Sequence, residues 1–177
     1  FSLETTEVTV SWFQILNSFF IITLASSFSK LWEKVWNPSG PVKFALGLIF
    51  VAVGFFALSY GSLSIPQGAK TATVSMIWLI LAYFFHTLGE LCLSPVGLSY
   101  VSKLSPKKFV GLLFGFWFTA SAIANYIAGY TGAYIDKISA MYSLSTFFII
   151  IAALPLSAAL MLLLFNKKLV KMMHGIK

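Results

Sequence analysis

Long apolar runs dominate this chain, and short polar stretches separate them. The runs are continuous rather than alternating, which favours helices over strands. A helix of about 20 apolar residues is long enough to cross the hydrocarbon core of a bilayer. The pattern predicts five such helices, at Ser11–Ser29, Val42–Leu63, Val74–Val101, Val110–Tyr130 and Ser143–Phe165. We therefore expect an all-α, polytopic membrane helix bundle.

Composition supports the membrane interpretation. The chain is 59% hydrophobic and only 10% charged, whereas soluble domains carry about 25% charged residues. Its one cysteine, Cys92, lies inside an apolar run and excludes an intrachain disulfide. The chain starts at Phe1 with no charged leader before the first apolar run, so we expect residues 1–177 to be a fragment of a longer protein.

The basic residues predict an orientation. All twelve are lysines. Ten of them flank the loop between the first two predicted helices, the loop between the third and fourth, and the end of the fifth; Lys70 and Lys137 lie on the opposite side. The positive-inside rule then places the N-terminus outside and the C-terminus in the cytoplasm, in a membrane that we expect to be the bacterial cytoplasmic (inner) membrane. Nucleic-acid binding explains these loop lysines poorly.

The second predicted helix carries a stripe of small residues. Gly47, Gly54 and Gly61 recur at seven-residue spacing, which allows a neighbouring helix to approach closely. In the third predicted helix, Pro95 cannot donate to the carbonyl of Leu91, so we expect a kink there.

Apart from Lys43 at the start of the second predicted helix, Glu90 is the only formally charged side chain inside the predicted helices. A carboxylate at bilayer depth costs on the order of 3 kcal/mol, so such a group usually faces a cavity or a polar partner. Its helical face also carries a phenol, two hydroxyls and a glycine: Tyr83, Thr87, Ser94 and Gly97. Glu90 either binds a cationic group of a solute or pairs with a cation of another helix. We prefer the first interpretation, because this chain offers no buried cation.

Three other residues are candidates for the same site or its surroundings. His86, four residues before Glu90, is interpreted as a hydrogen-bonded ring, with a proton relay as the alternative. Asn17 either joins two helices or orients a ligand amide. Trp117 lies deep for an interface anchor, so it can form the wall of a pocket. One histidine makes no metal site, and no nucleophile–base motif is present, so we do not expect an enzyme.

Three segments resemble the second half of proton-dependent oligopeptide transporters, a family of the major facilitator superfamily. They are SWFQILNSFFII (11–22), HTLGELCLSPVGLSYVSKLSP (86–106) and GLLFGFWF (111–118). The resemblance implies that the predicted helices are part of the C-terminal half of a major facilitator fold. It also implies proton-coupled symport of di- and tripeptides, with protons as the coupling ion and no other cofactor.

The resemblance also implies roles for single residues. Glu90 matches the acid that binds the amino terminus of the peptide, and Asn17 matches an asparagine that contacts its backbone or amino end. Ser94 lies one turn below Glu90 in the same pocket. Trp117 and Phe118 match aromatic residues that shape side-chain pockets and help to close the cytoplasmic gate. Phe118 follows from the resemblance alone.

The resemblance leaves a large part of the family unmatched. The acid and arginine cluster of its first helix and the acid of its seventh helix have no counterpart here. The expected partners are therefore small peptides, the lipid bilayer and the missing N-terminal transmembrane half. Two alternatives remain open. One is transport of another solute by the same fold, and the other is a non-transporting membrane scaffold or assembly subunit in which Glu90 pairs with a partner helix.

Overall fold

A computed structural model describes residues 10–67 and 74–173, with side chains described from Ile15 onward. The described residues are helical and contain no strand. The elements, in chain order, are α1 (Val10–Lys30), the π-helical turn η1 (Leu31–Val35), α2 (Gly40–Gly61), α3 (Ile77–Leu104), the 3-10 turn η2 (Lys107–Phe109), α4 (Val110–Gly132), α5 (Ile135–Met141) and α6 (Leu144–Met172).

Five of these helices are long and apolar enough to cross a membrane, as the sequence predicts. Their bounds differ most in two helices. Helix α3 spans Ile77–Leu104 rather than Val74–Val101, and α6 continues past Phe165 to Met172. The apolar run ends at Phe165, but Asn166, Lys167 and Lys168 continue the same helix, because polar side chains at a membrane surface do not interrupt backbone hydrogen bonding.

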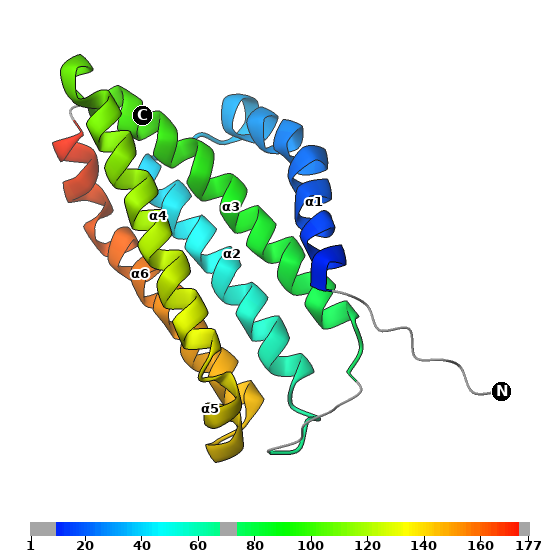
Figure 1. Ribbon diagram of the computed structural model, residues 1–177. Helices are drawn as coiled ribbons and strands as arrows, with labels where there is room; N and C mark the ends of the chain where they lie inside the picture. Colours follow the sequence, from blue (N-terminus) through cyan, green and yellow to red (C-terminus); the bar gives the residue numbers. More distant parts are fainter. Residues whose placement is uncertain (1–9, 68–73, 174–177) are drawn as a thin grey trace.

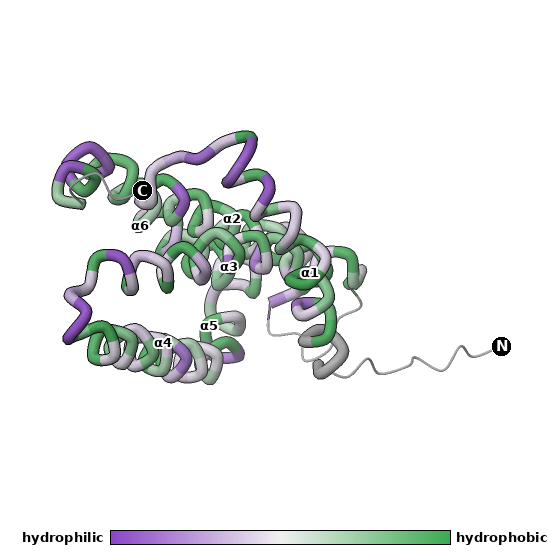
Figure 2. The backbone as a smooth tube through the Cα atoms, turned by 90° about the horizontal axis from the view of Figure 1, so that it is seen from above, coloured by the Kyte–Doolittle hydropathy of each residue, from purple (hydrophilic) through white to green (hydrophobic). Residues whose placement is uncertain are grey.

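The helices alternate in direction, so five lysine-rich termini lie at one end of the bundle. The end of α1, the start of α2, the end of α3, the start of α4 and the end of α6 lie together in Figure 1. In Figure 2 hydrophilic positions gather in the connection between α1 and α2 and at the end of α6, while the helices are largely hydrophobic. Lys137 lies in α5, at the opposite end, and Lys70 lies outside the described residues. The lysine-rich end is called the basic end below.

Helices α2 and α3 form the centre of the bundle. Along their contact, glycines of α2 face larger side chains of α3. A Cβ atom built on Gly54 would lie 2.5 Å from the His86 ring, and one on Gly61 would lie 2.6 Å from Trp78. At Gly47 the nearest atoms include the backbone oxygen of Gly89, at 2.9 Å. The glycine stripe of α2 therefore lies directly against α3, which confirms the close approach that its spacing predicts.

Helix α6 packs along α2 on the side away from α1 (Figure 2). Buried hydroxyls join these two helices: the Ser59 and Ser145 hydroxyl oxygens lie 2.8 Å apart, and Ser59 also donates to the Ser145 carbonyl at 3.1 Å. Near the basic end Ser39 donates to the Asn166 side chain at 2.8 Å. Pairs of this kind satisfy polar groups that lipid cannot hydrogen-bond.

Helices α1 and α4 flank this centre (Figure 1). Helix α1 packs on α3, where the Phe20 and Phe84 rings meet edge to face with centroids 5.5 Å apart. Helix α4 also packs on α3, but none of its residues is buried. Pro95 and Pro155 lie inside α3 and α6, and neither proline ends its helix.

Candidate substrate-binding site

Glu90 and Asn17 meet between α1 and α3. The Asn17 side-chain nitrogen donates to a carboxylate oxygen of Glu90 at 3.4 Å, across 73 positions of sequence. The buried Thr87 hydroxyl lies 2.5 Å from the Asn17 side-chain oxygen. With that oxygen engaged, the amide of Asn17 points its nitrogen toward Glu90. Thr87, Asn17 and Glu90 thus form a short chain of hydrogen bonds that joins the two helices.

The carboxylate of Glu90 is exposed in the structure of this chain, although its position in an apolar run suggested burial. The reason lies in the neighbours of α3. The adjacent Gly89 packs against Val51 and Gly47 of α2, so that face of α3 is closed. Glu90 lies on a different face, beside α1, where its carboxylate remains accessible. An accessible carboxylate held by one neutral amide retains capacity to accept further hydrogen bonds, which suits it to a cationic partner.

The other members of the polar face of α3 separate into different environments. Ser94 is half-buried, one turn beyond Glu90 toward the basic end. Gly97 is buried, and a Cβ atom there would lie 2.1 Å from the tip of the Trp117 indole. Trp117 therefore contacts α3 between Glu90 and the basic end, and it sets how closely α4 approaches α3.

The aromatic residues of α4 do not join Glu90 in one cavity. Trp117 lines an apolar cavity of about 460 Å³ at the basic end, together with Gly97, Tyr100 and Leu113. Phe118 is 61% exposed and does not line that cavity. The structure thus brings Asn17 and Glu90 together, places Ser94 nearby, and leaves Trp117 and Phe118 apart from them.

His86 faces away from Glu90. Its ring lies against Gly54 of α2, with its centroid 4.7 Å from that of the Phe55 ring. Its Nε2 nitrogen is buried and has no hydrogen-bond partner among the described residues. These contacts show a ring packed against α2 and directed away from Glu90, and the expected hydrogen bond of the ring stays a prediction.

Thr87 was the residue of this site that sequence reasoning did not select. Its position on the same face as Glu90 was apparent, but a hydroxyl inside a helix most often bonds its own backbone. The Thr87 hydroxyl also lies 2.8 Å from the Tyr83 carbonyl oxygen, so its single hydrogen is shared between that carbonyl and Asn17. Its second contact, with Asn17, depends on the packing of α1, which no local pattern specifies.

The five long apolar helices, with a carboxylate–amide pair between two of them, are typical of a polytopic membrane helix bundle. A model of the POT family matches residues 2–150. The chain belongs to the POT family, and its five long helices form part of the major facilitator fold.

Several relatives resemble this chain over most of its length. The uncharacterized transporter YclF of Bacillus subtilis (strain 168) is 41% identical over 139 residues, which cover 77% of this chain and 27% of the relative. The peptide transporter YePEPT of Yersinia enterocolitica is 37% identical over 163 residues, covering 89% of this chain and 32% of the relative. These relatives are transporters rather than enzymes.

Solved structures give the same result. A mutant of a peptide transporter POT in complex with sulfate superposes with a TM-score of 0.74 at 36% identity, over 94% of this chain and 33% of that one. A POT family transporter in complex with a thioalcohol-conjugated peptide gives a TM-score of 0.73 at 29% identity, over 88% of this chain and 31% of that one. The chain thus spans about a third of the length of the transporters it matches.

Proposed function

We propose that this chain supplies the amino-terminus side of the substrate site in a proton-coupled symporter of di- and tripeptides. Membership of the POT family supports transport, and relatives include a di-/tripeptide transporter of Lactococcus lactis that is 31% identical over 94% of this chain. The remaining helices, including the proton-coupling groups, come from an N-terminal transmembrane half. The observation that carries the proposal is the accessible Glu90 carboxylate held by Asn17.

The chemistry of the proposed site follows from the charge of a peptide. The peptide ammonium carries three donors and no acceptor, so Glu90 is its natural partner. Within the water-poor interior of a bundle this charge-assisted pair is stronger than in bulk water. Asn17 already contacts the carboxylate and carries both a donor and an acceptor, which suits it to the amino end or the first amide of a peptide. Ser94 offers a hydroxyl one turn away.

The test is uptake of labelled dialanine into proteoliposomes that contain the complete transporter, with an inward proton gradient. Glu90→Gln keeps the size and hydrogen-bonding ability of the side chain but removes its charge. We expect dialanine affinity to fall by about tenfold or more, because a charge-assisted bond becomes a neutral one. Asp136→Asn in α5, at the far end from the basic end, is the matched control and should leave uptake unchanged.

Two results would contradict the proposal. Unchanged dialanine affinity in a folded Glu90→Gln protein would remove Glu90 from the site. Absence of gradient-driven uptake by the wild-type protein would remove small peptides as substrates.

A second candidate substrate class is a small amine-bearing acid other than a peptide. One solved POT family transporter, 29% identical to this chain, is in complex with 5-aminolevulinic acid. Glu90 would pair with the ammonium of such a molecule in the same way. Competition separates the two classes, because only a peptide carrier is inhibited by dialanine more strongly than by 5-aminolevulinic acid.

A further inference from the structure

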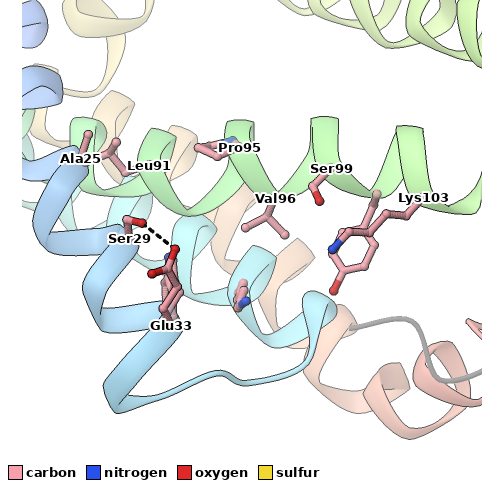
Figure 3. Close-up of a pocket in the computed structure, with 11 residues that line it drawn as sticks. Ala25, Ser29, Glu33, Leu91, Pro95, Val96, Ser99 and Lys103 are labelled. Carbon is pink, nitrogen blue, oxygen red and sulfur yellow. Dashed lines mark hydrogen bonds between the residues drawn. The ribbon is translucent and has the colours of Figure 1, made fainter.

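A cavity of about 300 Å³ lies between α1, α2 and α3 at the basic end of the bundle. One wall is the end of α1 with η1, and the opposite wall is α3 from Leu91 to Lys103 (Figure 3). None of the five candidate substrate-site residues lines it. This space is called the basic-end cavity, and the proposed peptide function leaves it without a role.

The cavity carries charges of both signs on separate elements. Lys43 of α2 and Lys103 of α3 contribute ammonium groups, and Glu33 of η1 contributes a carboxylate. The Glu33 carboxylate accepts a hydrogen bond of 3.1 Å from the Ser29 hydroxyl, which fixes its orientation (Figure 3). The Lys43 nitrogen donates to the Asn37 side chain at 2.8 Å and lies 5.2 Å from the centroid of the Trp32 ring. A ligand of one sign alone would meet a like charge here.

Trp32 adds a donor that lacks an acceptor. Its indole nitrogen is buried, and no group in the described part of the chain accepts its hydrogen. A buried donor without a partner costs about 1–3 kcal/mol, so such groups usually meet a ligand or water. The hydroxyl of Ser99 also lines the cavity. Donors therefore accompany the two ammonium groups, as a phosphate requires.

The location favours a lipid as the source of that phosphate. Trp32 and Trp36 lie at the end of the first membrane-spanning helix, where aromatic residues mark the level of the headgroups. Basic pockets between transmembrane helices at this level bind phospholipid headgroups. The Glu33 carboxylate further favours a headgroup that also carries a cationic group with N–H donors.

We propose that the basic-end cavity binds the headgroup of an aminophospholipid of the phosphatidylethanolamine type. Its phosphate is held by Lys43 and Lys103, with the Trp32 N–H as a further donor. Its primary ammonium is held by Glu33, which Ser29 orients. This headgroup offers both signs of charge and N–H donors for Glu33, whereas a purely anionic lipid lacks the cation and a quaternary choline has no N–H to donate.

The test places the complete transporter in nanodiscs that contain phosphatidylethanolamine, phosphatidylglycerol or phosphatidylcholine, and measures retained lipid by native mass spectrometry. Wild-type protein should retain phosphatidylethanolamine preferentially. Lys43→Gln should weaken retention of both phosphatidylethanolamine and phosphatidylglycerol by about tenfold. Glu33→Gln should weaken phosphatidylethanolamine only, and should strengthen phosphatidylglycerol because a like charge is removed. Lys34→Gln, which neighbours Glu33 but does not line the cavity, is the matched control and should change neither.

Two further arms complete the test. Val96→Phe fills the cavity without changing its charge and should abolish the preference, so a result is available even if a charge variant does not fold. Competition by soluble phosphoethanolamine shows whether the headgroup alone binds; displacement equal to that by the lipid would assign the site to a soluble ligand instead. Equal retention of the three lipids by the wild type, or equal retention profiles in Glu33→Gln and Lys34→Gln, would overturn the proposal.

Discussion

Asn17 sets the geometry of the candidate site through the nitrogen and the oxygen of its side-chain amide. An asparagine amide can present either its oxygen or its nitrogen to a neighbour. Here the Thr87 hydroxyl engages the oxygen at 2.5 Å, and the nitrogen is left for Glu90. The orientation of the amide toward the carboxylate therefore depends on a buried hydroxyl that a ligand at Glu90 does not need to touch.

Replacement of Thr87 by valine tests this dependence. Thr87→Val keeps the side-chain shape but removes the donor to Asn17, so the amide can turn and its nitrogen no longer points reliably at Glu90. Loss of one buried hydrogen bond costs about 1 kcal/mol, and we expect dialanine affinity of the complete transporter to fall by about fivefold. Equilibrium binding of labelled dialanine measures the change.

Thr23→Val provides the comparison for that experiment. Thr23 lies on the same helix as Asn17, is exposed, and donates to the Phe19 carbonyl of its own helix at 2.8 Å. Its replacement should leave affinity unchanged. If Thr87→Val lowered thermal stability but left dialanine affinity at the wild-type value, the hydroxyl would be structural only.

Sequence reasoning reached part of this site. Glu90 is evident because a carboxylate is costly among apolar neighbours, and Asn17 because amides in membrane helices need partners. Their mutual hydrogen bond joins residues 73 positions apart, and it depends on how α1 packs against α3. The roles of Trp117 and Phe118 as pocket aromatics, which the resemblance implies, stay a prediction: the two residues lie apart from Glu90 in this chain, which spans about a third of the transporters it matches.

At the scale of elements, α2 and α3 pack closely because several contact positions of α2 are glycines, which have no side chain. Gly47→Ala would place a Cβ atom 2.7 Å from Leu93 and 2.9 Å from the backbone oxygen of Gly89. Leu93 can rotate, but the backbone of α3 cannot move without separating the helices. We expect the variant to be less stable by about 1–3 kcal/mol, measured as a lower Tm of the purified transporter in detergent.

Gly129→Ala controls for the intrinsic effect of alanine in a helix. No atom lies within 4 Å of a Cβ atom at Gly129, and alanine favours a helix over glycine by about 1 kcal/mol. Its Tm should equal or exceed that of the wild type. Equal Tm values for Gly47→Ala and Gly129→Ala would show that α2 and α3 do not approach as closely as described.

The elements themselves were predictable because the apolar runs are long and continuous. All five membrane-spanning helices were expected, and the glycine stripe correctly indicated a close helix neighbour. The short helix α5 was not expected, because Ile135–Met141 mixes charged and apolar residues in a connection too short to show a period. The π-helical turn of η1 was also missed, since its backbone hydrogen bonds leave no signature in residue type.

At the scale of the whole molecule, the lysine-rich ends of the helices predict which side faces the cytoplasm. The buried Cys92 can be replaced by serine to give a background without cysteine in this chain. Ala140→Cys in α5 and Lys168→Cys in α6 then place single exposed thiols at opposite ends. An impermeant maleimide added to intact cells should label the first and not the second.

Permeabilised cells supply the control, because both thiols should then react. Labelling of Lys168→Cys, but not of Ala140→Cys, in intact cells would reverse the orientation. The positive-inside rule would then fail for this chain, although nine lysines of its described part lie at one end.

The small and large residues along α2 and α3 also constrain how this protein can evolve. Gly40 faces Tyr100, Gly54 faces His86 and Gly61 faces Trp78, so each glycine accommodates one bulky neighbour on the antiparallel helix. A larger residue at any of these glycines is compatible with the fold only if its partner becomes smaller. Among homologous sequences, size at these paired positions should therefore vary inversely, and a single change at either member should be rarer than a matched double change.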